Sequence, residues 1–143
     1  MFLEFLPRVQ ASISQPVDPG NPFSASVTIV NSGRIPLNAV SVRIGLGLIC
    51  GARAPCSIPL HPDPNIDYSS SIGEFGGPTR RMAPGDQFTF VLDQLAVAPD
   101  GLKYADIAVI VDYEVPVIRY KREKKLGLFT RKETDGRTYW SWK

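Results

Sequence analysis

The strongest constraint on this fold is a repeated alternation of apolar and polar residues. Between residues 40 and 48 every even-numbered residue is apolar, whereas the odd-numbered residues are serine, arginine or glycine. Residues 105–113 repeat the pattern, and their second face carries the apolar Ala108 and Ile110 between Asp106 and Asp112. Successive side chains of a β-strand point to opposite faces of a sheet, so each stretch predicts a strand with a buried face. The second stretch is expected to be central and partly covered on both faces.

Turn signals separate these stretches. The chain holds 13 prolines and 12 glycines in 143 residues, which a mostly helical fold rarely tolerates. Pro-Gly or Asp-Gly pairs occur at 84–85, 100–101 and 135–136, where proline presets φ or glycine accepts a positive φ. We therefore predict an all-β fold, an antiparallel β-sandwich of about seven to nine strands, as one domain over residues 1–143.

The alternation also predicts which segments form strands and which side chains form the core. The predicted strands cover 9–13, 23–29, 40–48, 68–75, 88–92, 105–113, 119–130 and 138–142. The last two, in the segment 119–143, are expected to form a C-terminal hairpin around an Asp-Gly turn. The predicted core between the sheets consists of Val27, Ile29, Val42, Ile44, Leu46, Phe88, Phe90, Ile107, Val109 and Val111.

Residues 51–81 break the alternation and are predicted to form one long loop. They contain five prolines and four glycines, and loops of this length are uncommon in compact domains and often functional. Cys50 and Cys56 are the two cysteines of the chain, with five residues between them. We expect a local disulfide between them, which would indicate an oxidising compartment; two free thiols are the alternative.

Three segments resemble bacterial immunoglobulin-like modules of envelope and surface proteins. Residues 26–42, Ser-Val-Thr-Ile-Val-Asn-Ser-Gly-Arg-Ile-Pro-Leu-Asn-Ala-Val-Ser-Val, resemble their second and third strands with an Asn-x-Gly turn. Residues 82–90 resemble the apolar-x-Pro-Gly-Asp start of a later strand, and 105–113 are similar to the penultimate core strand. The resemblance covers roughly residues 8–115, although the facing cysteine pair of antibody domains is absent. It implies an immunoglobulin-like sandwich that serves as an extracytoplasmic adhesion, spacer or assembly module without catalytic activity.

The charge is unevenly distributed, although the whole chain carries only +2. Residues 1–118 contain seven Lys and Arg against eleven Asp and Glu, whereas residues 119–143 contain nine against three. Such a basic end can contact nucleic acid or an anionic membrane surface, or dock on the acidic body of another copy. The first seven residues lack the basic and long apolar regions of a secretory signal. The protein is therefore expected in the periplasm or on the cell surface if the chain is a fragment lacking its leader, and in the cytoplasm otherwise.

Little in the sequence points to catalysis or to a cofactor. His61, Asp63 and Asp67 lie close in sequence, but their spacing matches no calcium loop, so no metal site is predicted. Two cysteines cannot complete a zinc site. The Gly45-Leu-Gly47 sequence lies inside a predicted strand, where glycine marks a bulge or close packing. We predict neither an enzyme nor a cofactor.

Two surfaces are candidates for binding, because sandwiches place ligand contacts in loops and on edge strands. The first is the long loop, with Tyr68, Ile72, Phe75, Arg80 and Arg81. The second is the C-terminal hairpin, with Tyr120, Lys124, Lys125, Tyr139, Trp140 and Trp142. Trp, Tyr and Arg are enriched at the energetic centres of interfaces, although these tryptophans could instead pack against their own sandwich.

Three functions are compatible with the sequence. The favoured interpretation is a non-enzymatic extracytoplasmic module that binds a protein partner or associates head to tail with itself. The alternative is a basic-patch module that contacts nucleic acid or an anionic membrane, because basic residues and stacking rings interleave near the C-terminus. A small enzyme is the least favoured, since acidic residues distant in sequence can still meet in space.

Overall fold

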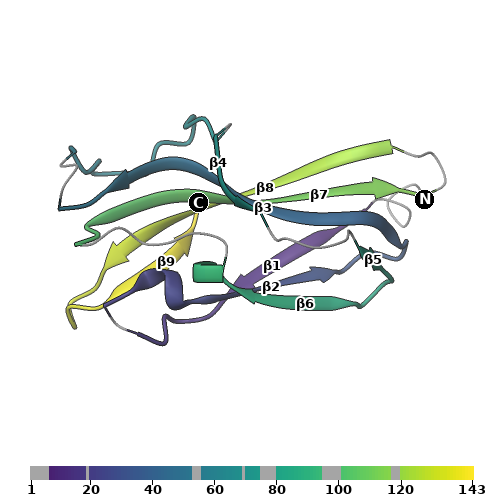
Figure 1. Ribbon diagram of the computed structural model, residues 1–143, viewed down its shortest axis with the longest axis horizontal. Helices are drawn as coiled ribbons and strands as arrows, with labels where there is room; N and C mark the ends of the chain where they lie inside the picture. Colours follow the sequence, from purple (N-terminus) through teal and green to yellow (C-terminus); the bar gives the residue numbers. More distant parts are fainter. Residues whose placement is uncertain are drawn as a thin grey trace.

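The computed structural model of the protein describes residues 7–18, 20–52, 56–68, 70–74, 80–94, 101–116 and 120–143. These residues form two antiparallel sheets that pack face to face, which confirms the predicted all-β sandwich (Figure 1). The smaller sheet has the order β1-β2-β6, with strands β1 (Val9–Ile13), β2 (Ser26–Asn31) and β6 (Gln87–Val91). The larger sheet has the order β4-β3-β7-β8-β9, and β5 also pairs with β3. Its strands are β3 (Leu37–Cys50), β4 (Ser70–Glu74), β5 (Arg80–Met82), β7 (Tyr104–Val115), β8 (Tyr120–Lys132) and β9 (Thr138–Trp142).

Three long strands, β3, β7 and β8, form the middle of the larger sheet. They contain 14, 12 and 13 residues, respectively. Val109 of β7 lies opposite Ile44 of β3 and Leu126 of β8. Ile107 and Val111 share its face, because side chains alternate along a strand. The alternation seen in the sequence therefore becomes the apolar inner face of this sheet.

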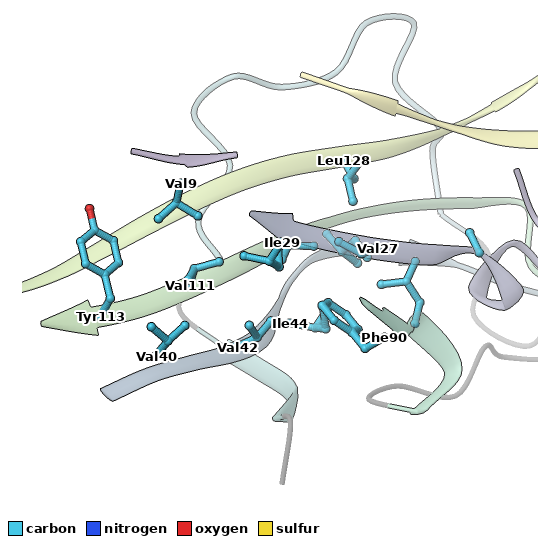
Figure 2. Packing of buried hydrophobic residues seen from close by; sticks show 14 of the residues in the cluster. Val9, Val27, Ile29, Val40, Val42, Ile44, Phe90, Val111, Tyr113 and Leu128 are labelled. Atoms are coloured by element: carbon cyan, nitrogen blue, oxygen red, sulfur yellow. The ribbon is translucent and has the colours of Figure 1, made fainter. Parts of the chain in front are cut away.

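The core fills the space between the two sheets (Figure 2). Most of the predicted core residues are buried, namely Val27, Ile29, Val42, Ile44, Phe90, Ile107, Val109 and Val111. The prediction was wrong for Leu46 and Phe88, which are only half-buried. Leu46 adjoins a register shift between β3 and β7, and Phe88 lies on β6 at the edge of the smaller sheet. Edge and bulge positions have fewer neighbours to cover a side chain than the centre of a sheet does.

The predicted strand at 23–29 begins too early. Residues Pro22–Ser24 form a 3₁₀ turn, η2, in which Phe23 N donates to the side-chain oxygen of Asn21 at 3.1 Å. Proline at the start of such a turn presets φ and removes an amide that would otherwise lack a partner. Phe23 and Ala25 are fully buried nonetheless, so their apolar spacing reflects a buried turn rather than the first residues of a strand.

The predicted long loop at 51–81 contains two short strands of the larger sheet. β4 lies within the strand predicted at 68–75. β5, with three residues, was not predicted, because so short a segment carries no recognisable alternation. A second 3₁₀ turn, η3 (Leu92–Gln94), follows β6.

The Asn-Ser-Gly turn after β2 and the Pro-Gly turn before β6 meet at one end of the sandwich. Asn31 is fully buried, and its Nδ2 donates to the backbone oxygen of Met82 at 3.0 Å. Its Oδ1 accepts from Gly33 N at 3.1 Å, and its backbone oxygen accepts from Gly85 N at 2.8 Å. Gly85 has φ +86°, a conformation that glycine adopts without strain. One buried asparagine therefore joins the turn after β2 to the turn before β6.

Truncation of a core side chain should show how much the stability depends on this packing. Ile107→Ala is expected to lower the free energy of unfolding by about 2–4 kcal/mol, because it removes buried methylene groups and leaves a cavity. Ile58→Ala is the matched control, since Ile58 is 49% exposed. Urea unfolding of both variants would measure the difference, and equal losses would contradict the placement of Ile107 in the core.

Candidate functional site

The outer face of the larger sheet is covered by the segment 56–68, which follows the disulfide. Tyr68 and Ile66 pack on Ala108 and Ile110 of β7, and together they form a second, smaller apolar cluster. Residues 104–111 of β7 are consequently buried on both faces. This confirms that the strand is central and covered on both sides.

Two glycines of β3 make room for Tyr68. A Cβ atom on Gly45 would lie 2.7 Å from the backbone oxygen of Tyr68 and 2.9 Å from its Cβ. A Cβ atom on Gly47 would lie 2.8 Å from Cε1 of the same ring. All three distances are too short for real atoms, so larger residues would push Tyr68 off the sheet. The Gly45-Leu-Gly47 sequence therefore marks close packing, as predicted, and β3 also shifts register beside both glycines.

A polar cluster of Tyr68, Asp106 and Lys143 lies under this segment. Tyr68 Oη donates to Asp106 Oδ1 at 2.5 Å, and Lys143 Nζ lies 2.7 Å from Asp106 Oδ2. Lys143 Nζ also donates to the backbone oxygen of Asp63 at 2.8 Å and lies 5.1 Å from the centroid of the Tyr68 ring. Asp106 is 1% exposed, and a buried carboxylate is costly unless it is paired and hydrogen-bonded.

The charged and polar groups of this cluster are paired with one another. Both oxygens of Asp106 are engaged, and Lys143 is held by a carboxylate and a carbonyl. Burial, followed by the hydrogen bond to Asp106, raises the pKa of Tyr68 well above its ordinary value, so the phenol stays protonated as a donor. Burial also raises the pKa of Tyr104, whose hydroxyl has no hydrogen-bond partner among the described residues.

A disulfide between Cys50 and Cys56 holds the covering segment to the end of β3, as predicted from the sequence. The two Cα atoms lie 5.5 Å apart. Cys50 is buried, and its backbone oxygen accepts from Lys103 N at 2.8 Å. The bridge shortens the chain path between the end of β3 and Tyr68, and so favours the packing of Tyr68 on the outer face of the larger sheet.

Charged side chains occupy the rest of the outer face. Arg43 Nε donates to Asp112 Oδ2 at 3.0 Å, and its Nη2 pairs with Glu123. Lys125 Nζ lies 3.4 Å from the other carboxylate oxygen of Glu123. This network joins β3, β7 and β8 across the sheet. Exposed pairs of this kind contribute little stability individually.

A groove opens where β8 extends beyond the end of β9. β9 pairs with Leu128–Lys132 of β8, and Figure 1 shows β8 continuing past the C-terminus of the chain. We call this hollow the basic groove; it has a volume of about 430 Å³ and is lined by Val9, Ala11, Lys124, Leu126, Trp142 and Lys143, among others. One wall is β1, the edge strand of the smaller sheet, and the other is the uncovered part of β8.

The basic groove combines a large ring with a free positive charge. Trp142 is 36% exposed, whereas most large apolar side chains of the sandwich are buried. Lys124 is exposed and forms no ion pair with a residue that the structure describes. An exposed tryptophan and an unpaired cation lining one hollow are typical of a binding surface rather than of a core.

A second hollow, of about 450 Å³, is lined by residues of β3, β7 and the start of β8. Its lining includes Ala39, Glu114 and Lys121, so its charge is mixed. Ala39 has φ +50°, a left-handed conformation that is uncommon for alanine, and it lies where β3 shifts register. Nothing at this hollow favours one class of ligand.

The structure brings together three of the predicted binding residues, Lys124, Lys125 and Trp142, in the basic groove. It places Trp140 in the core, which is the packing alternative for the tryptophans. The ring of Trp140 meets Phe23 edge-on at 5.5 Å, and its Nε1 donates to Pro22 O at 2.7 Å.

The remaining predicted binding residues lie apart from the basic groove. Tyr68 is buried under the segment described above, and Tyr139 donates from its hydroxyl to Asp135 on the hairpin turn. Arg81 is exposed on β5, and the guanidinium of Arg80 lies 4.3 Å from the ring centroid of Phe88. Phe75 and the side chains of Ile72 and Tyr120 lie outside the described residues.

Sequence reasoning missed the partnership of Asp106 with Lys143. The available signal was an acidic residue inside the otherwise apolar run from Ala105 to Val111, which requires a buried partner. The identity of that partner could not be read from the sequence, because Tyr68 and Lys143 are separated from Asp106 by 38 and 37 positions.

The region around His61 behaves as a set of turns. Asp63 Oδ1 accepts from Asn65 N at 2.9 Å, the hydrogen bond of an Asx-turn. Across the described ranges, no group of three or more His, Cys, Asp or Glu side chains could hold a metal ion.

The same ranges contain no helix long and apolar enough to cross a membrane. Comparison with protein families, curated proteins and solved structures found no match to this chain.

Removal of the Tyr68 hydroxyl tests the polar cluster. Tyr68→Phe should lower the free energy of unfolding at pH 7 by about 1.5–3 kcal/mol, because buried Asp106 loses a donor. The folded-state pKa of Tyr68 exceeds its unfolded value of about 10, so its contribution is complete below that pH and is lost as pH rises further. The variant should therefore lose less stability than the wild type between pH 9 and pH 11.

Tyr139→Phe is the matched control for this experiment. Its hydroxyl also donates to a carboxylate, that of Asp135 at 2.7 Å, but on the exposed hairpin turn. Urea unfolding over the same pH range should show a much smaller change at pH 7 for this variant. If the two variants behave alike, Tyr68 does not hold a buried carboxylate.

Thiol titration tests the disulfide. Protein purified without reductant should show no reactive thiol in denaturant. Reduction should lower the free energy of unfolding by about 2 kcal/mol in the loop-entropy description. A Cys50→Ser, Cys56→Ser variant is the control, since its stability should not respond to reductant. Two titratable thiols in the wild type would show that the bridge does not form.

Proposed function

We propose that this chain is a non-enzymatic binding module that works outside the cytoplasm and holds a partner protein in the basic groove. The observation that carries the proposal is the joint exposure of Trp142 and Lys124 beside β1, an edge strand. Interfaces are enriched in tryptophan at their energetic centres, and positive charge gives them selectivity for acidic partners.

The disulfide supports a site of action outside the cytoplasm. Bridges such as Cys50–Cys56 persist in oxidising compartments and are rare in reducing ones. The segments that resemble bacterial immunoglobulin-like modules agree with this placement, and Asn31 joins two of them at one end of the sandwich. Modules of that kind act as adhesion, spacer or assembly domains in envelope and surface proteins.

The distribution of polar groups supports binding over catalysis. The buried carboxylate of Asp106 is occupied by Tyr68 and Lys143, so it serves packing. The exposed charges of the basic groove are lysines on a strand, which suit recognition of an anionic partner. The lysines also suit nucleic acid or anionic lipid, and these ligands are the alternative function.

Titration with three anionic probes separates these functions. Polyglutamate, a single-stranded oligothymidylate and vesicles with anionic phospholipid would be added to ¹⁵N-labelled protein, with the resonances of Lys124 and the Trp142 indole followed by NMR. We expect polyglutamate to perturb both groups and to lose its effect at high salt, because exposed charges are screened. Lys124→Glu should weaken this binding at least several-fold, whereas Lys132→Glu, at the far end of β8, should not.

The other outcomes of the titration are equally informative. Binding of the oligonucleotide or the vesicles in place of polyglutamate would establish the alternative function. Concentration-dependent sedimentation without any probe would indicate association between copies. If no probe shifts the groove resonances and the protein remains monomeric, the basic groove is not a binding site.

A further inference from the structure

We infer that the basic groove accepts an extended acidic segment of a partner protein, which adds to the free edge of β1 as a fourth strand of the smaller sheet. This inference rests on the proposed function and names the chemistry of the partner. The first evidence is the difference between the two sheets. The smaller sheet has three strands against six in the larger one, and its edge strand β1 lines the basic groove together with residues of β8 and β9.

The backbone of β1 has hydrogen-bonding groups to offer at this edge. Ser14 N donates to Ser26 O and Ser32 N donates to Arg8 O, so even-numbered residues of β1 pair with β2. In an antiparallel ladder bonded and non-bonded pairs alternate. The amides and carbonyls of Val9, Ala11 and Ile13 therefore point away from β2, where no described strand pairs with them.

Among the residues that the structure describes, Val9–Ile13 lacks the usual protection against strand addition. Exposed edge strands normally carry lysine, proline or a bulge that prevents pairing with other chains. The sequence of β1 is Val-Gln-Ala-Ser-Ile, with no charge and no proline, and its pairing with β2 shows no register shift. An incoming strand could pair over all five residues.

The wall opposite β1 determines which strand fits. Alternate side chains of an added strand would face β8 and β9, where Leu126 is half-buried and Trp142 is 36% exposed. Lys124 lies two residues before Leu126, on the same face of β8. The complementary strand therefore has inward-facing residues that are acidic at the Lys124 end and apolar at the Trp142 end.

The lysines also exclude the commonest competitor, another copy of this chain. Pairing two copies through the basic groove would bring the unpaired Lys124 of each copy toward that of the other. Juxtaposed like charges are unfavourable, and they discriminate against the wrong partner as effectively as contacts favour the right one. An acidic strand neutralises the same residues, so the charge that prevents self-pairing selects the partner.

Short synthetic peptides test the inference with the protein unchanged. The probes are Glu-Thr-Glu-Thr-Val-Thr-Val and its reversed sequence, which allow for either strand direction. At least one should bind and slow hydrogen exchange at the amides of Val9, Ala11 and Ile13 by about tenfold or more, because those amides become hydrogen-bonded. The same peptides with lysine in place of glutamate should not bind.

Backbone methylation distinguishes strand addition from simple charge attraction. Two versions of the bound peptide would carry N-methyl groups on alternate residues, one on odd and one on even positions. An added strand pairs along one edge only, so one version should lose at least tenfold in affinity and the other should bind like the parent. Lys124→Glu should weaken the parent peptide about tenfold, and Lys132→Glu should leave its affinity unchanged.

The results separate this inference from the proposed function. Equal affinities of the two methylated peptides, or protection of β8 at 121–125 in place of β1, would overturn strand addition at β1. Binding of polyglutamate that depends on Lys124 would still support the proposed function in that case. If neither polyglutamate nor any peptide binds, both the inference and the proposed function fail.

Discussion

The structure depends on β7 being buried on both faces. Eight consecutive residues, 104–111, are buried, although an antiparallel sheet usually leaves one face in water. The smaller sheet covers the inner face. The outer face needs a cover from elsewhere in the chain, and the segment 56–68 provides it through Tyr68 and Ile66. Gly45 and Gly47 leave room for Tyr68 on the sheet, and the disulfide holds the start of the segment next to the end of β3.

Asp106 links the doubly covered strand β7 to Lys143, the last residue of the sequence. A carboxylate in a doubly covered strand must be paired, and its partners come from the covering segment and from the residue after β9. Trp140 adds a second attachment through Phe23 and Pro22 in η2. The last strand is therefore held at both faces of the larger sheet.

Because of these contacts, the basic and aromatic residues near the C-terminus fall into two groups. Trp140 and Lys143 are occupied by contacts within the sandwich, whereas Lys124 and Trp142 remain at a surface. The division follows from where β9 stops along β8: β9 ends opposite Leu128, and the preceding residues 124–127 of β8 line the basic groove. The proposed binding site is thus a consequence of one strand being shorter than its neighbour.

The local alternation and the turn residues were sufficient to predict the all-β sandwich, most strands and most of the core. These features are local, since a strand face and a Pro-Gly turn are each encoded within a few residues. β5 and η2 were missed because three residues carry too little pattern, and Leu46 and Phe88 were misassigned because burial depends on neighbours across the sheet. Cys50 and Cys56 were paired correctly because they are close in sequence.

Which residues had to be hidden, and where the chain had to turn, follow from the amino-acid sequence alone. How distant residues meet was decided by the packed sheets: Tyr68 and Lys143 on Asp106, Asn31 against the turn before β6, and β1 beside the uncovered part of β8. The physical reason is that periodicity specifies a face but not its partner. The partner depends on strand order, on register and on where each strand ends, and these are properties of the packed sheets as a whole.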